Sequence, residues 1–205
     1  QPSAREIREV SDAVRQVKEN HPDLKICACM GLLNDAQAEA LHAAGVDRYN
    51  HNLNTAQNHY NTICTTHTYD DRVDTVKSVS RSGISPCSGV IVGMGETNDD
   101  LVQIALELRS LAVDSIPVNF LIPIEGTPLE NNPPRIDPHF ALRVLSMFRF
   151  VCPDREIRLS AGREVHLGTL QPLGLYPANA IFVADYLTEK GQPPEEDWRM
   201  IEELG

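Results

Sequence analysis

The chain has 205 residues, of which 41% are hydrophobic and 23% charged, as is typical of a globular protein that buries a core. Its net charge of −11 argues against a nucleic-acid partner, because such partners require clustered Lys and Arg. No apolar run approaches the roughly 20 residues of a membrane span, and the first residues lack the apolar core of a signal peptide. We therefore expect no nucleic acid and no membrane among its partners.

The chain contains five cysteines: Cys27, Cys29, Cys64, Cys87 and Cys152. An odd number without a secretory signal argues against a disulfide framework and indicates the reducing cytoplasm. Packing in the core is the ordinary alternative for each of these thiols. The sequence begins at Gln1 without an initiator Met, and we expect a piece of a longer chain.

Helical and apolar segments alternate along the chain. Ser3 followed by Glu6 is a capping-box signature, and apolar residues at helical spacing follow it. Helices are expected at 4–20, 35–44, 69–82, 99–111, 138–151 and 178–187, and short buried strands at 24–29, 46–50, 85–92, 116–122 and 156–160. A polar loop is expected at 52–66 and a charged C-terminal tail at 188–205, within a single domain of residues 1–205.

This alternation predicts an α/β fold of about five parallel βα units. A doubly wound sheet and part of a (β/α)8 barrel both fit. Polar residues follow all five strands at their carboxyl ends, where a barrel assembles its active site. A complete barrel needs about 250 residues, so we favour a partial barrel.

Residues 49–55 read YNHNLNT at the end of the second expected strand. Alternation along a strand puts Asn50, Asn52 and Asn54 on one side and His51 opposite. A row of amides suits a polar, uncharged ligand such as a urea or a ribose. A turn held by Asx hydrogen bonds explains the same residues equally well.

Two further features have both a functional and a purely structural interpretation. Residues 89–96 read GVIVGMGE, which matches neither phosphate-binding glycine motif and fits a tight βα turn. Cys27, Cys87 and Arg158 all lie on expected strands and would meet inside a barrel if they share inward parity. An iron–sulfur cluster would explain two thiols beside a guanidinium, whereas packed thiols and an Arg at the barrel mouth need no ligand.

Five segments together resemble the biotin synthases. They are YNHNLNT at 49–55, TTHTYDDR at 65–72, CSGVIVGMGET at 87–97, PVNFL at 117–121 with GTPL at 126–129, and RLSAGRE at 158–164. Their order and spacing are those of the family. Residues 89–96 also resemble the adenine-side signature of the wider radical S-adenosylmethionine enzymes.

The resemblance implies a fold, a reaction and a set of roles. Biotin synthases are homodimeric (β/α)8 barrels in which a [4Fe–4S] cluster cleaves S-adenosylmethionine to a radical, and a [2Fe–2S] cluster supplies sulfur to dethiobiotin. An electron donor such as flavodoxin or ferredoxin is implied. The resemblance assigns Cys27, Cys87 and Arg158 to the [2Fe–2S] cluster, Asn50, Asn52 and Asn119 to dethiobiotin, and Asn54, Arg72 and Ile91 to S-adenosylmethionine.

Departures from the family limit what the resemblance implies for this chain. The C-x-x-x-C-x-x-C motif that binds the [4Fe–4S] cluster is absent, as is an upstream Cys that would be the fourth [2Fe–2S] ligand. Asn54 stands where an acidic residue is common, and His67 where Arg is frequent. We therefore expect a C-terminal fragment of the enzyme that is inactive alone.

Two alternatives stay open at this stage. The chain could belong to a related radical enzyme with another substrate, or act as a non-catalytic binding or assembly fragment. The sequence immediately upstream discriminates among these alternatives, because a C-x-x-x-C-x-x-C motif there would favour the catalytic interpretation.

Overall fold

The computed structural model describes residues 1–130, 136–186 and 189–205. Within these ranges the helices are α1 (Ala4–Asn20), α2 (Asp35–Ala44), α3 (Gln57–Ile63), α4 (Tyr69–Arg81), α5 (Asn98–Ser110), α6 (Pro138–Val151), α7 (Arg163–Leu167), the 3₁₀ turn η1 (Gly168–Leu170), α8 (Gln171–Gly174) and α9 (Pro194–Leu204). The strands are β1 (Cys27–Ala28), β2 (Arg48–Asn50), β3 (Ser85–Cys87), β4 (Val90–Val92), β5 (Ser115–Phe120), β6 (Glu156–Leu159) and β7 (Ala180–Ile181). None of the helices in this part of the chain has the length and apolar character needed to cross a bilayer.

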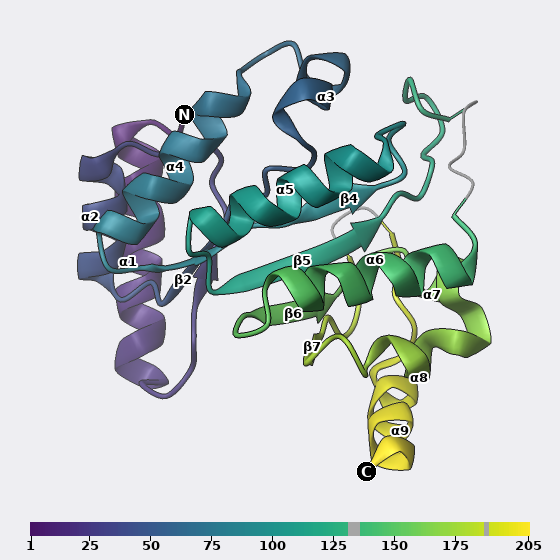
Figure 1. The fold of residues 1–205 in the computed structure, drawn as a ribbon. Coiled ribbons are helices and arrows are strands. Elements are labelled where there is room, and N and C mark those ends of the chain that lie inside the picture. Colours follow the sequence, from purple (N-terminus) through teal and green to yellow (C-terminus); the bar gives the residue numbers. More distant parts are fainter. Residues whose placement is uncertain (131–135, 187–188) are drawn as a thin grey trace.

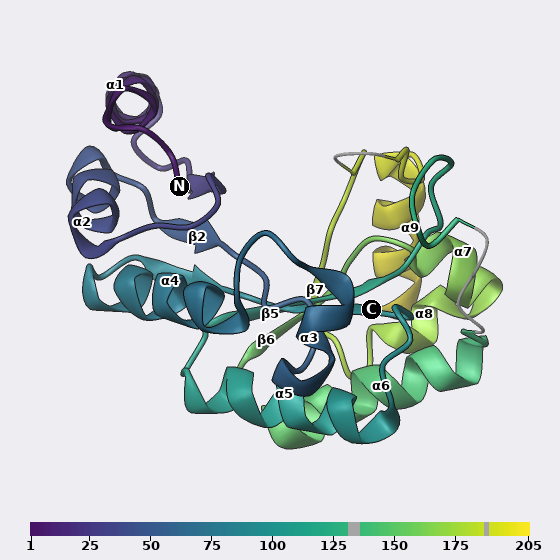
Figure 2. The same ribbon diagram turned by 90° about the horizontal axis from the view of Figure 1, so that it is seen from above.

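The strands form one parallel sheet whose spatial order follows the chain. The order is β1-β2-β3-β5-β6-β7, and β4 continues the line of β3 by pairing with β5. Helices α1, α2, α4, α5 and α6 follow one another around the convex side of this curved sheet (Figures 1 and 2). A doubly wound sheet would reverse its strand order and carry helices on both faces. The predicted partial barrel is therefore confirmed.

Local signals fix most helix ends where the sequence predicts them. At α1 the Glu6 amide donates to Ser3 Oγ at 3.2 Å, and the Ser3 amide donates to Glu6 Oε2 at 2.7 Å. Helix α2 ends at Gly45, whose φ of 103° is left-handed and therefore favours glycine. These contacts lie within one turn of the chain, so the sequence alone is enough to predict them.

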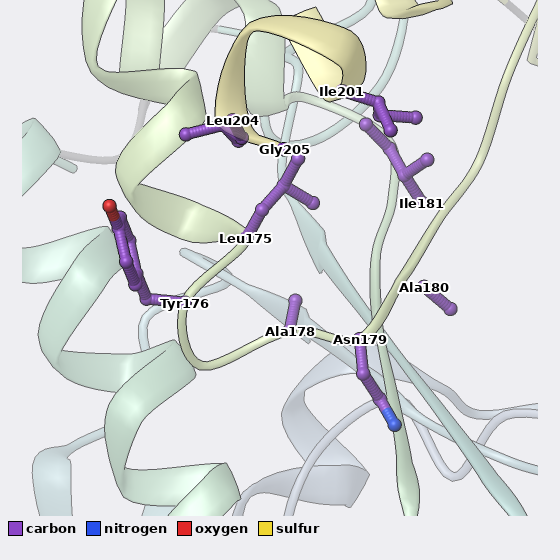
Figure 3. A pocket seen from close by; sticks show the side chains of 9 residues that line it. All are labelled: Leu175, Tyr176, Ala178, Asn179, Ala180, Ile181, Ile201, Leu204 and Gly205. Atoms are coloured by element: carbon purple, nitrogen blue, oxygen red, sulfur yellow. The ribbon is translucent and has the colours of Figure 1, made fainter.

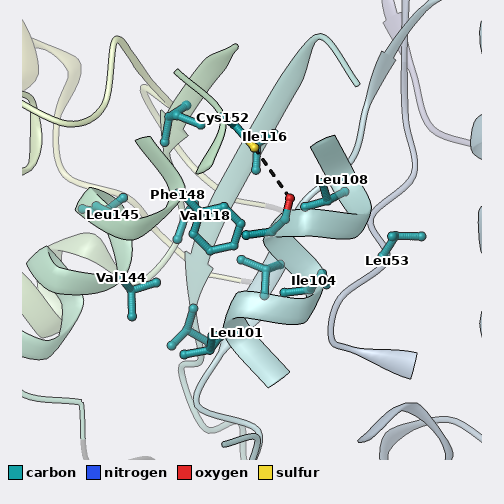
Figure 4. Close-up of a cluster of buried hydrophobic side chains, with 14 of the residues drawn as sticks. Leu53, Leu101, Ile104, Leu108, Ile116, Val118, Val144, Leu145, Phe148 and Cys152 are labelled. Atoms are coloured by element: carbon teal, nitrogen blue, oxygen red, sulfur yellow. Dashed lines mark hydrogen bonds between the residues drawn. The ribbon is translucent and has the colours of Figure 1, made fainter. Parts of the chain in front are cut away.

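Apolar side chains on the convex face form the core with the helices. Figure 4 shows part of it, where Phe148, Leu145 and Val144 of α6 lie near Ile116 and Val118 of β5. Cys152 belongs to this cluster, and its thiol lies 3.6 Å from the carbonyl oxygen of Ala105. A second cluster joins α1 and α2 to the first strands. Cys152 thus has the packing role that is ordinary for a buried thiol.

Three local predictions are wrong. The helix expected at 178–187 is not formed among its described residues, because residues 180–181 pair with β6 as strand β7; residue 187 lies outside the described ranges. The polar loop expected at 52–66 contains helix α3. The strand expected at 85–92 is two strands separated by Ser88 and Gly89, and a Cβ at Gly89 would lie 1.9 Å from the carbonyl oxygen of Pro117.

The charged C-terminal segment is ordered by one buried ion pair. Within residues 189–205 the chain forms α9, and Asp197 accepts from Arg163 Nη2 at 2.7 Å with both side chains fully buried. Arg163 follows β6, so this pair ties α9 to the carboxyl end of the sheet. Gln192 also donates to Asp197, which satisfies more of the buried carboxylate.

Candidate active site on the concave face of the sheet

The strand register places one polar set of residues on the face opposite the helices. Cys27 pairs with Arg48, and Arg48 with Ser85; Cys87 pairs with Ser115, and Ser115 with Glu156. Paired residues of parallel strands share a face, as do residues two apart on one strand. Cys27, Cys87 and Arg158 therefore lie on the same, concave face. The residues that alternate with the concave-facing ones along each strand, such as Tyr49, Val118 and Leu159, face the helices.

The two thiols lie in different surroundings on this face. Cys87 is buried, and its sulfur accepts a hydrogen bond from Asn50 Nδ2 at 3.3 Å. Cys27 is open to the concavity, yet desolvation by the protein around it, followed by the charge of Cys87, raises the pKa of its thiol to about 11. Arg48 and Arg158 oppose this rise. Cys27 is thus a neutral thiol at pH 7, and ligation to a metal would require loss of its proton.

Glu156 joins the two guanidinium groups beside these thiols. Its Oε1 accepts from Arg48 Nη1 at 2.9 Å, from Ser115 Oγ at 2.6 Å and from Arg158 Nη2. Burial alone would raise the pKa of Glu156, but the Ser115 hydrogen bond and the two Arg partners outweigh it and lower the pKa. A hollow of about 500 Å³ next to this group is lined in part by Cys27, Arg48 and Arg158.

Sequence reasoning missed Arg48, Ser115 and Glu156. A signal was present, because Glu156 stands two residues before Arg158 and Arg48 two before Asn50, with the same inward parity. The pattern becomes informative once the neighbouring strands are known.

The Asn-rich segment after β2 is tied to the neighbouring loop and to α4. Arg72 Nη1 donates to the carbonyl oxygen of Asn52 at 2.6 Å, and its Nε donates to the Tyr60 hydroxyl. Asn52 Oδ1 accepts from the Gly89 amide at 3.0 Å. Asn54 is left-handed, with φ of 72°, and its amide donates to the Gly89 carbonyl oxygen at 3.0 Å. Asn52, Asn54 and Arg72 are therefore neighbours, as a common site requires.

Ile91 and Asn119 lie side by side on β4 and β5. Asn119 Nδ2 donates to the Val90 carbonyl oxygen at 3.1 Å, while its Oδ1 accepts from the Ala161 amide at 3.3 Å. The side chain therefore links β4 to the segment that follows β6. After β4, Glu96 accepts the amides of Gly93 and Met94 at 2.6 and 2.7 Å and fixes the glycine-rich turn.

His51 is buried between these polar groups. Among the described residues its Nε2 has no hydrogen-bond partner. Burial, followed by the charges of Arg72 and His67, lowers its pKa to about 4. His51 is therefore neutral at pH 7 and contributes no charge to the site.

A second hollow is lined by residues from the C-terminal part of the chain. It has a volume of about 370 Å³ and is lined mainly by apolar residues beside β7 and by α9, including Leu175, Ile181, Ile201 and Leu204 (Figure 3). It contains no thiol and none of the site residues expected from the sequence. We therefore place the candidate site on the concave face.

The thiol pair is too small to be a whole metal site. In the described ranges no group of three or more His, Cys, Asp or Glu side chains could hold a metal ion. Two thiols beside a guanidinium fit a partial set of ligands for an iron–sulfur cluster. No second set of cysteines in this part of the chain fits a further cluster.

Two family models together span almost the whole chain. Residues 3–108 match the Radical SAM superfamily, and residues 117–205 match the Biotin and Thiamin Synthesis associated domain. The chain is 55% identical over 204 residues to the biotin synthase of Macrococcus caseolyticus (strain JCSC5402), covering 100% of the chain and 62% of that protein. It is 58% identical to the biotin synthase of Bacillus velezensis (strain DSM 23117 / BGSC 10A6 / LMG 26770 / FZB42), covering 60% of that protein.

The chain thus spans about three fifths of these relatives' length. Solved structures agree on the fold at low identity. Methylornithine synthase superposes with a TM-score of 0.81 at 22% identity, over 97% of this chain and 62% of that one. The FeFe-hydrogenase maturase HydG from Carboxydothermus hydrogenoformans gives 0.80 at 14% identity, over 99% and 52%. The chain belongs to the radical SAM superfamily, and the resemblance to biotin synthases seen in its motifs extends over its full length.

Proposed function

We propose that this chain is part of a biotin synthase, in which it provides the barrel wall where sulfur is inserted into dethiobiotin. The observation that carries the proposal is the meeting of Cys27, Cys87 and Arg158 on one concave face, in a chain 55–58% identical to biotin synthases. A barrel interior with two thiols and two guanidinium groups has no packing advantage. Ligation of a cluster explains it.

The cofactors follow from the superfamily and from the thiols. Membership of the superfamily implies a [4Fe–4S] cluster and S-adenosylmethionine, which together supply a carbon radical when bound. The [4Fe–4S] ligands would come from residues outside the printed sequence. For the [2Fe–2S] cluster, Cys27, Cys87 and Arg158 would provide three ligands. Asn50 would support Cys87, because its amide already donates to the sulfur.

The amides and Arg72 divide the remaining face between two ligands. Asn54, Arg72 and Ile91 would bind S-adenosylmethionine, with Arg72 held in place by Tyr60 and the Asn52 carbonyl. Asn50, Asn52 and Asn119 would surround dethiobiotin. Asn52 keeps its Nδ2 group for a urea oxygen, because its Oδ1 is taken by the Gly89 amide.

The cellular setting is part of the same proposal. All five cysteines are free, which suits the reducing cytoplasm. An electron donor such as flavodoxin or ferredoxin would reduce the [4Fe–4S] cluster. The enzyme would work as a homodimer.

The test uses the full-length protein that contains this chain, reconstituted with iron and sulfide without oxygen. With reductant, S-adenosylmethionine and dethiobiotin it should form both 5′-deoxyadenosine and biotin. Cys87→Ala should abolish biotin formation and the [2Fe–2S] absorption, whereas Cys152→Ala, whose thiol packs against Ala105, should keep both. Equal damage by the two variants would overturn the ligand assignment. 5′-Deoxyadenosine without biotin would instead indicate another substrate, and neither product a non-catalytic role.

A further inference from the structure

The carboxylate of Glu156, the first residue of β6, contacts a side chain from a strand that is not its neighbour in the sheet. Arg48 belongs to β2 and Glu156 to β6, with β3 and β5 between them. In a flat sheet three strand spacings amount to roughly 14 Å. The 2.9 Å contact between Arg48 Nη1 and Glu156 Oε1 is possible because the sheet is curved, and it crosses the concave face over β3 and β5.

The same oxygen also binds Arg158. Among the described residues three donors converge on Glu156 Oε1: Arg48, Arg158 and the hydroxyl of Ser115. Hydrogen bonds within this part of the chain use only Nη2 of Arg158, so its other nitrogen atoms are left for a ligand. Ser115 in turn is the strand partner of Cys87, which places the carboxylate beside the thiols.

Stability gives no reason for this arrangement. All three charged side chains are more than two thirds buried, with exposures of 28% for Arg48, 29% for Glu156 and 23% for Arg158. Desolvation of such groups offsets most of their attraction, and apolar residues of similar size are often as stable. An arrangement that gathers two guanidinium groups and a carboxylate on the face that carries both thiols is explained better by positioning.

We propose that Glu156 is a positioning residue, which holds the Arg158 guanidinium toward Cys27 and Cys87 and is itself braced by Arg48 and Ser115. This inference rests on the proposed function, because Arg158 is taken there as a cluster ligand. Besides bracing Glu156 by a hydrogen bond, Arg48 balances the negative charge of its carboxylate. Without Glu156, Arg158 would lose its only side-chain acceptor among the described residues and turn away from the thiols.

The experiment compares Glu156→Gln with Glu156→Asp in the full-length protein after anaerobic reconstitution. We expect Glu156→Gln to lower the [2Fe–2S] content at least twofold, to alter its visible absorption, and to shift its midpoint potential in the positive direction, because a nearby negative charge is lost. Glu156→Asp keeps the negative charge and should retain at least half of the native cluster content. Glu39→Gln, on the exposed face of α2, is the matched control and should change none of these readings.

A double variant separates positioning from a purely structural ion pair. Arg48→Gln combined with Glu156→Gln removes both charges of the Arg48–Glu156 ion pair. The double variant should recover the thermal stability that Glu156→Gln loses, but not the native absorption spectrum. The inference is overturned if the double variant also restores the spectrum, or if Glu156→Gln leaves content, spectrum and potential unchanged. Cys87→Ala in the same series tests the proposed function independently: if it keeps the [2Fe–2S] cluster, the ligand assignment itself fails.

Discussion

The two faces of the same sheet follow opposite rules. On the convex face, Ile116 and Val118 of β5 and Leu159 of β6 are fully buried against helices. The residues that alternate with them along the strands, among them Asn119 and Arg158, face the concavity and carry hydrogen bonds. One residue of displacement along a strand thus changes an apolar environment into a polar one.

Substitutions on the two faces should therefore disturb different properties of the protein. On the convex face a side chain contributes through volume and contact, so its loss should change the free energy of unfolding. On the concave face a side chain contributes through particular donors and acceptors, so its loss should change ligand binding.

The largest effect is expected on the convex side. Phe148 of α6 is fully buried in the core, and Phe148→Ala should lower the free energy of unfolding by about 3–5 kcal/mol through the cavity it leaves. Phe150 lies on the same helix but is 85% exposed, so Phe150→Ala should cost less than about 0.5 kcal/mol. Urea denaturation of both variants measures the difference. Similar losses would show that α6 does not pack on the sheet as described.

A smaller effect is expected from protonation of the buried His51. The pKa of His51 is lowered to about 4 in the folded state, against about 6.5 in the unfolded state. The unfolded state therefore binds more protons between these values. The stability linked to neutral His51 is complete above pH 6.5 and is lost as the pH falls toward 4, by about 3 kcal/mol.

Unfolding measured across this pH range should show the loss in the native protein. His51→Gln should flatten that part of the profile, because an amide does not titrate. His139→Gln changes an exposed histidine and serves as the control. If His51→Gln leaves the profile as steep as before, His51 is not the group responsible.

The smallest effect is expected at the contact between α3 and α4, beside the Asn-rich segment. Tyr60→Phe removes the hydroxyl that accepts from Arg72 Nε, a loss of about 1 kcal/mol. S-adenosylmethionine binding to the full-length protein should weaken roughly fivefold, while the fold is retained. Tyr176 is 78% exposed, and Tyr176→Phe, which removes its hydroxyl, should leave binding unchanged. Calorimetric titration measures both, and an unaltered affinity in Tyr60→Phe would remove Arg72 from the binding site.

Much of the candidate site was predictable because its residues stand in recognisable motifs. Cys27, Cys87 and Arg158 were expected on strands of one parity, and the register brings them to one face. Arg48 and Glu156 were not predicted, because they stand 108 residues apart in no motif. Their contact depends on the curvature of a sheet with two strands between them.

Local sequence was enough to predict the helices whose ends are set within one turn, such as α1 by the Ser3–Glu6 capping box and α2 by Gly45. It was also enough to predict the parallel order, since helices alternate with short apolar strands. Strand β7 was not predictable in this way, because its two residues become a strand only by pairing with β6. The same holds for the break at Gly89, where the backbone of Pro117 leaves no room for a Cβ. The interactions that end a helix form between residues a few positions apart, whereas β7 and the break at Gly89 depend on partners that only folding brings near.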